Sequence, residues 1–173
     1  MSVVCAKILG NRIELSADSI MVYGYSKDTR NIFSKVNEAN GMIMGAVGLC
    51  RETSFMWHYM QTNKPADATD RAVLEFMISF AKWKKDLTND SSVENDYMLI
   101  FGNKIFQIEG LFVYSMGNEG DFGSIGAGRD FANTALKLGK SPSEAVKIAC
   151  ELSCYVAEPI LNKTIVITKD NIC

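Results

Sequence analysis

Residues 2–18, SVVCAKILGNRIELSAD, carry the pattern of a β-hairpin over their whole length. Val3–Leu9 is rich in apolar and β-branched residues, which favour strands. Gly10-Asn11 is a typical turn pair, and Arg12–Asp18 then alternates apolar with polar side chains. Such alternation indicates a strand with one buried face. We therefore expect two antiparallel strands at the start of the chain.

A second hairpin is predicted downstream of the first. Its strands are Phe33–Asn37 and Gly41–Val47, joined by the turn-like segment Glu38–Gly41. Within the second strand, Met42–Val47 is a continuous apolar run. A short run of this kind is typical of a strand that is covered on both sides. We therefore expect this strand to lie inside the molecule.

The second half of the chain also contains strand patterns. Tyr97–Phe101 and Ile105–Ile108 predict a third hairpin around Gly102-Asn103. Residues 110–123 contain four glycines and are expected to form a looser stretch. Thr164–Thr168 reads as a closing strand because it is apolar and β-branched.

Two helices are expected between the second and third hairpins. The first runs from Leu49 to Met60, and its apolar residues recur at helical spacing. The second begins after Asp67 or Thr69, either of which is a suitable N-cap. Apolar side chains at steps of three and four residues continue this amphipathic helix to Leu87.

A second pair of helices is expected near the end of the chain. One starts near Gly128 and ends before Gly139, which fits the position after the last helical turn. The other begins at Ser141-Pro142-Ser143-Glu144, where a serine N-cap, a proline and a glutamate form a capping box. Its apolar face extends to Val156, and Pro159 would end it.

The order of elements is strands, two helices, strands, two helices and a strand. This order differs from the strand–helix alternation of a doubly wound parallel sheet. It predicts an α+β fold, a four-layer αββα sandwich of two antiparallel sheets with a helix pair on each outer face. Because no linker divides the 173 residues, we interpret residues 1–173 as a single domain.

Composition excludes several functional classes. Hydrophobic residues make up 47% and charged residues 22%, and 18 basic against 20 acidic side chains leave a net charge of −2. This balance argues against nucleic acid as the main partner. No apolar run reaches the 18 residues of a membrane span, and the N-terminus lacks the basic and apolar regions of a signal peptide.

The cysteines do not suggest a metal site or a disulfide framework. They number five, show no CxxC spacing, and are accompanied by one histidine, His58. We therefore expect no metal ion and no cofactor, and interpret the cysteines as reduced thiols of a cytoplasmic protein. The chain also lacks the GxSxG, HExxH and P-loop motifs. His58 lies in a predicted helix between two aromatic residues, and we favour a structural role for it.

One catalytic possibility remains at the start of the chain. If Met1 is removed, Ser2 carries both a hydroxyl and a free α-amine. The amine has an ordinary pKa of about 7.7–8.0, so it can act as a base for its own hydroxyl. A Met-Ser start is common in cytoplasmic proteins, and Ser2 alone therefore does not establish this chemistry.

The whole chain resembles the proteasome β-subunit family of N-terminal nucleophile hydrolases, including its bacterial HslV branch. Ser2 and Asp18 stand 16 positions apart, as the nucleophile and the hairpin aspartate do in that family. Each motif is weak alone, and their order and spacing carry the resemblance. The other matching segments are Ser16–Ser19, Lys35–Val36, Gly41–Gly48, Ser124–Ala132, Ser141–Val146 and Ile165–Asp170.

The resemblance implies a catalytic site of four residues. Ser2 would be the nucleophile, and Lys35 would lower the pKa of its hydroxyl and α-amine. Asp18 would hold Lys35 in place, and the backbone N–H of Gly45 would donate to the oxyanion. Without the resemblance, Asp18 and Lys35 would be interpreted as a surface ion pair worth ~0–1 kcal/mol.

The resemblance also implies the first substrate pocket, which would be lined by Met21, Phe33, Ile43 and Val47. All four are apolar, which predicts cleavage after apolar or aromatic residues. The alternative interpretation is that these side chains fill the core between the two sheets.

The resemblance implies a self-compartmentalising peptidase that acts on unfolded polypeptides. It would form a homo-oligomeric ring, stacked in pairs, and an AAA+ unfoldase would feed it. Two departures favour an inactive shell or binding subunit instead. Ala127 replaces a family serine near the α-amine, and a retained Met1 would block that amine. A small-molecule amidase of the same class is a third hypothesis.

Overall fold

The computed structural model describes residues 2–24, 26–28, 30 and 34–167. Its first sheet has four antiparallel strands in the order β10-β1-β2-β11. They span β1 Val4–Leu9, β2 Arg12–Asp18, β10 Phe122–Ile125 and β11 Ile160–Val166. The expected N-terminal hairpin is therefore present, and its register pairs Val4 with Ala17.

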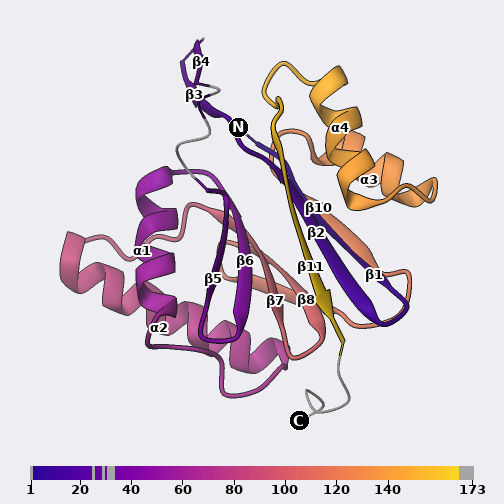
Figure 1. Ribbon diagram of the computed structural model, residues 1–173. Coiled ribbons are helices and arrows are strands. Elements are labelled where there is room, and N and C mark those ends of the chain that lie inside the picture. The colour runs from indigo at the N-terminus through magenta and orange to yellow at the C-terminus, as the bar shows by residue number, and fades with distance from the viewer. Residues whose placement is uncertain (1, 25, 29, 31–33, 168–173) are drawn as a thin grey trace.

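The second sheet has five antiparallel strands in the order β5-β6-β7-β8-β9. They span β5 Val36–Ala39, β6 Met42–Val47, β7 Asp96–Phe101, β8 Lys104–Glu109 and β9 Phe112–Met116. A small separate hairpin, β3 Met21–Tyr23 and β4 Ser26–Asp28, follows β2. Figure 1 shows this hairpin at the same end of the molecule as the N-terminus.

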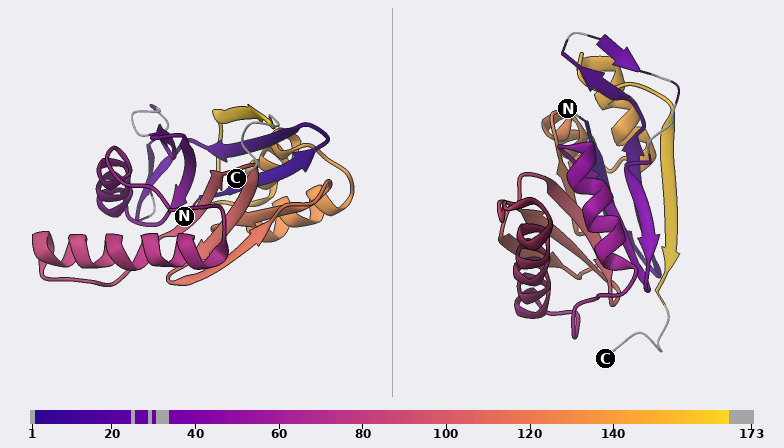
Figure 2. Two further views of the ribbon diagram at one scale, coloured as in Figure 1. Left: turned by 90° about the horizontal axis from the view of Figure 1, so that it is seen from below. Right: turned by 90° about the vertical axis from the view of Figure 1, so that its left-hand side faces the viewer.

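Two pairs of helices cover the outer faces of the sheets (Figure 1). The helices α1 Cys50–Met60 and α2 Asp70–Thr88 pack on the five-stranded sheet. On the four-stranded sheet lie α3 Arg129–Lys137 and α4 Pro142–Leu152. Figure 2 shows the same layers from two other directions. The predicted four-layer αββα architecture is thus confirmed.

Each layer boundary has its own apolar cluster. One lies between α1, α2 and the five-stranded sheet, one between the sheets, and one beneath α3 and α4. In strand β1, successive side chains point to opposite faces of the sheet and so enter different clusters. Val4 points between the sheets, whereas Val3 and Cys5 point toward α3 and α4. The strand β6 alternates in the same way, with Met44 facing the helices and Val47 facing the other sheet.

The predicted caps of two helices are present. The Thr69 hydroxyl accepts a hydrogen bond from the Ala72 N–H at 3.2 Å, which identifies Thr69 as the N-cap of α2. At α4, Ser141 and Glu144 form the reciprocal capping box. Each cap satisfies backbone donors that the first helical turn would otherwise leave exposed.

Three expectations about the elements need correction. Residues 110–123 are not merely loose, because β9 lies within them and β10 begins in them. The helix α4 ends at Leu152 rather than near Pro159, although Val156 is still fully buried beneath it. The closing strand starts earlier than Thr164, because β11 pairs along the whole of β2 from Ile160 onward.

Candidate active site

The hairpin β1–β2 brings Asp18 to the start of the chain. Asp18 Oδ1 accepts a hydrogen bond from the Val3 N–H at 2.8 Å, and the Asp18 N–H donates to the Val3 carbonyl at 3.2 Å. Both follow from the register that pairs Val4 with Ala17. Asp18 therefore contacts the backbone of Val3, directly beside Ser2.

Lys35 approaches the same carboxylate from the other sheet. Its Nζ lies 2.6 Å from Asp18 Oδ2, and the side chains of Lys35 and Asp18 are only 6% and 0% exposed. The pair is therefore buried rather than a surface ion pair. Burial lowers the pKa of Lys35 and raises the pKa of Asp18, while their mutual attraction opposes both shifts.

A glycine-containing turn holds the backbone of Ser2. The Gly128 N–H donates to the Ser2 carbonyl at 3.1 Å. At Gly126 the backbone φ is +93°, and a Cβ there would clash with the same carbonyl oxygen. Between these two glycines, Ala127 is exposed. The turn thus fixes the main chain of Ser2, which is itself 5% exposed.

A small cavity of about 60 Å³ opens beside Ser2. Three of the residues expected in the site, namely Ser2, Met21 and Lys35, lie in its wall. Asp18 is directly behind them through its contact with Lys35. The cavity has room for part of one side chain. Its complete lining is Ser2, Ile20, Met21, Val22, Tyr23, Lys35, Ala46, Gly48, Cys50 and Thr53.

Gly45, which was expected to supply the oxyanion donor, is oriented differently. The Ala46 N–H donates to the Lys35 carbonyl at 2.9 Å, so the N–H of Ala46 points toward β5. Because N–H directions alternate along a strand, that of Gly45 points toward β7, where Met98 is its register partner. A Cβ at Gly45 would clash with Val4 Cγ1. The glycine therefore allows the two sheets to pack closely.

Ile43 and Val47 also differ from expectation, because they point away from the cavity. Both belong to the apolar cluster between the two sheets, as the alternative interpretation held. The physical reason is the period of two: residues 43, 45 and 47 share one face of β6, and Ala46 lies on the other. Phe33 lies outside the described residues.

Sequence reasoning missed the other face of this strand end. Ala46, Gly48 and Cys50 line the cavity at alternate positions, and the alternation directs the N–H of Gly48 toward the β5 side. Gly48 has φ +128°, a conformation that favours glycine. The matching segment Gly41–Gly48 ends in this glycine, which was the available signal in the sequence. The backbone conformation of Gly48, however, cannot be predicted from the residue types of that segment.

Other candidates are not part of this site. His58 is exposed on α1, and its ring centroid lies 5.8 Å from that of Trp83. A larger groove of about 540 Å³ runs along β8, β9, β10 and α3, and its lining includes Gln107, Tyr114 and Lys137 but no serine or carboxylate. Within the described ranges, no group of three His, Cys, Asp or Glu side chains could hold a metal ion.

Solved structures of the HslV and proteasome type have a similar fold. The superposition on "Thiobacillus denitrificans BPH" covers 97% of this chain and 100% of that chain, with a TM-score of 0.84 at 16% identity. A second structure, the same protein "in complex with Epoxomicin", gives 0.82 at 15% identity, with 96% and 99% of the two chains covered. "Eukaryotic HslV from Trypanosoma brucei" gives 0.69 at 17% identity, with coverage of 95% and 99%.

These similarities confirm the fold that the resemblance implied. The chain has the architecture of the N-terminal nucleophile hydrolases over nearly its whole length. It matches no protein-family model and no curated protein sequence. No helix in the described part of the chain has the length and apolar character that a membrane span requires.

Proposed function

We propose that this chain is a peptidase subunit whose nucleophile is Ser2 after removal of Met1. The observation that carries the proposal is the buried Lys35–Asp18 pair, with a 2.6 Å contact, whose lysine lies in the wall of the cavity that Ser2 also lines. Burying two charges is costly, so a pair placed beside a hydroxyl favours chemistry over a structural role.

The proposed reaction begins at the Ser2 hydroxyl. The α-amine takes the hydroxyl proton while Ser2 Oγ forms a bond to the carbonyl carbon of the peptide. Lys35 stabilises the developing negative charge, and Asp18 keeps the ammonium group in place. We assign the oxyanion donor to the N–H of Gly48, because Gly48 lines the cavity.

The rest of the cycle returns the enzyme to its starting state. The tetrahedral intermediate collapses as the C–N bond breaks, and the leaving amine takes the proton from the α-ammonium. Water then gives a proton to the α-amine and attacks the Ser2 ester. The C–O bond to Ser2 breaks, the carboxylic acid leaves, and the serine oxygen regains its proton.

Substrate preference follows from the wall of the cavity. Its apolar side chains come from Ile20, Met21, Val22 and Ala46, and Cys50 adds a thiol. The cavity of about 60 Å³ has room for part of one side chain. We therefore propose cleavage after apolar residues, and a peptide panel that differs only at this position would contradict the idea if charged side chains were preferred.

The proposed assembly is a homo-oligomeric ring, stacked in pairs and supplied with unfolded polypeptide by an AAA+ ATPase. Large apolar side chains on the surface support a subunit interface, among them Phe112 and Leu138. Four cysteines of the described residues are free thiols, which fits a reducing cytoplasm. Native mass spectrometry tests the ring directly, and a monomer at micromolar concentration would contradict it.

The deciding experiment is an intact mass of the purified protein with and without a peptide epoxyketone. This reagent forms a new ring by reacting with both a hydroxyl and a neighbouring free amine. We expect a mass that lacks Met1, together with one adduct. The variant Ser2→Ala has the same amine without the hydroxyl, so it serves as the matched control and should form no adduct.

A second candidate function is a catalytically inactive subunit of the same assembly. The observation in its favour is Ala127, which supplies no hydroxyl to the turn that holds the Ser2 backbone. If Met1 is retained and the protein forms a ring without an adduct, this second function replaces the first. A small oligomer that hydrolyses only small amides would support the amidase hypothesis.

A further inference from the structure

The backbone that follows β6 is held in an unusual conformation. Gly48 joins β6 to Leu49, the N-cap of α1, and has φ +128°. A Cβ at Gly48 would clash with the side-chain oxygen of Asn95. Gly48 and Asn95 are therefore in close contact, and Asn95 is fully buried.

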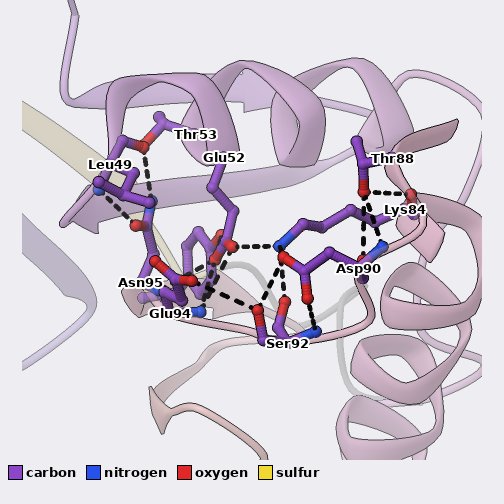
Figure 3. Close-up of polar contacts among 10 residues, drawn as sticks. Leu49, Glu52, Thr53, Lys84, Thr88, Asp90, Ser92, Glu94 and Asn95 are labelled. Atoms are coloured by element: carbon purple, nitrogen blue, oxygen red, sulfur yellow. Dashed lines mark hydrogen bonds and ion pairs between the residues drawn. The ribbon is translucent and has the colours of Figure 1, made fainter.

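The Asn95 amide binds both backbone groups of Leu49. Its Oδ1 accepts a hydrogen bond from the Leu49 N–H at 2.5 Å, and its Nδ2 donates to the Leu49 carbonyl at 3.0 Å. The same Nδ2 donates to Thr53 Oγ1 at 3.0 Å. The peptide group between Gly48 and Leu49 is thus fixed by a side chain from a distant part of the sequence (Figure 3).

A buried carboxylate in turn holds Asn95. Glu52 of α1 accepts hydrogen bonds from the Asn95 N–H at 2.9 Å and from the Tyr97 hydroxyl at 3.0 Å. It also accepts from the Glu94 N–H at 3.1 Å. Lys84 of α2 neutralises it across 2.8 Å, with side-chain exposures of 3% and 2% for the lysine and the glutamate. Figure 3 shows these contacts converging between α1 and the segment before β7.

The Lys84 ammonium has further partners on the same segment. It donates to the Ser92 carbonyl at 2.6 Å and lies 3.2 Å from Asp90 Oδ2. Its carboxylate neighbours raise the pKa of Lys84 in spite of the desolvation that opposes them. The ammonium therefore stays charged at neutral pH and ties α2 to the segment that carries Asn95.

A network of this kind is not required for stability alone. Buried ion pairs contribute little net stability compared with apolar side chains of similar volume, whereas a fully satisfied polar network defines one geometry. Here that geometry is the backbone at Gly48, Cys50 and Thr53, which line the cavity beside Ser2.

We propose that Asn95, supported by Glu52 and Lys84, is a positioning residue that aims the Gly48 N–H at the oxyanion formed on Ser2. The inference rests on the proposed function, because it takes the Gly48 N–H as the oxyanion donor. Asn95 touches Leu49 and packs on Gly48, so it acts through the backbone and not on the substrate.

The first measurement needs no catalysis. Hydrogen exchange of the segment that contains Leu49 is compared in the native protein and in Asn95→Ala, which removes the acceptor of the Leu49 N–H. Loss of the clamp should raise exchange at Leu49 at least about tenfold, with little change in segments of the other sheet. The control Met60→Ala removes a buried side chain of the same layer and should not raise exchange at Leu49 selectively.

The second measurement uses a fluorogenic peptide and a peptide boronate. The boron bonds to the Ser2 oxygen while the α-amine takes the proton, which leaves an anion where the oxyanion would form. For Asn95→Ala we expect kcat/KM to fall by about 10- to 100-fold with KM nearly unchanged, and the boronate Ki to rise by a similar factor. Glu52→Gln keeps an acceptor oxygen at the centre of the network, so it should have a smaller effect in the same direction.

The outcomes separate the two proposals. Unchanged exchange at Leu49 in Asn95→Ala overturns the clamp. Faster exchange with kcat no lower than in Met60→Ala shows a structural role only, and also overturns the positioning role. If the native protein neither turns over the peptide nor binds the boronate, the proposed function fails, and catalytic positioning by Asn95 falls with it. The exchange data then still decide whether Asn95 fixes the backbone.

Discussion

At the scale of single residues, two glycines at the end of β6 have different surroundings. Gly45 packs against Val4 between the sheets, whereas Gly48 lines the cavity beside Ser2. We predict that Gly45→Ala destabilises the protein by about 1–3 kcal/mol, because the new Cβ would overlap Val4 Cγ1. The double variant Val4→Ala, Gly45→Ala removes that overlap and should recover part of the lost stability, less the cost of the lost Val4 methyls. Urea unfolding of the native protein, both single variants and the pair measures this coupling. Additive effects would contradict it.

The residues of the proposed site differ in how far the sequence predicts their positions. Ser2, Asp18 and Lys35 were predicted together. The register of the β1–β2 hairpin converts the spacing of Ser2 and Asp18 into proximity, whereas Lys35 reaches Asp18 from the other sheet and shares a cavity wall with Ser2. The resemblance implied Gly45 as the oxyanion donor, and the sequence does not indicate which face of β6 meets the cavity. A strand shifted by an odd number of residues exchanges its two faces. That choice is made by the contact of β6 with β1, which only the folded chain contains.

At the scale of elements, the capping box of α4 gives a prediction with a defined pH dependence. Ser141→Ala should destabilise the protein by about 0.5–2 kcal/mol at neutral pH, whereas Ser143→Ala, inside the helix, should have a small effect. The hydrogen bonds of Glu144 to the Ser141 N–H and hydroxyl lower its pKa from 4.5 to about 2. A carboxylate with a lowered pKa stabilises the fold above pH 4.5, and this contribution is lost as the pH falls toward 2.

The measurement is urea unfolding of both variants at pH 7 and pH 3. The stability difference between the native protein and Ser141→Ala should be smaller at pH 3, because Glu144 is already protonated in the unfolded chain at that pH while it stays mostly ionised in the folded protein, so part of its contribution is lost. A difference that is equal at the two pH values would contradict the role of the charge.

Elements with caps of this kind were predicted well, whereas β9 was missed. Its neighbouring glycines suggested a loop, and pairing with β8 made it a strand.

At the scale of the whole molecule, the cluster between the sheets makes the two halves depend on each other. Val4 and Leu15 of one sheet and Met98 and Ile105 of the other all belong to it. The sequence predicted two stacked sheets from element order and the absence of a linker, but not the residues through which they meet. Because neither sheet can bury its inner face alone, we propose that residues 1–173 unfold as one domain.

The two tryptophans offer a test of this proposal, because Trp57 lies on α1 and Trp83 on α2. Their fluorescence reports only the layer on the five-stranded sheet, whereas far-UV circular dichroism reports both halves. We predict that the two signals give the same urea midpoint at a fixed protein concentration. Met98→Ala should shift both midpoints together, with a loss of about 2–5 kcal/mol, because Met98 is fully buried between the sheets. If fluorescence changed at a different urea concentration from circular dichroism, the halves would unfold separately. The buried Lys35–Asp18 pair, which joins the two sheets, would then be lost when the first half unfolds, while the other half is still folded.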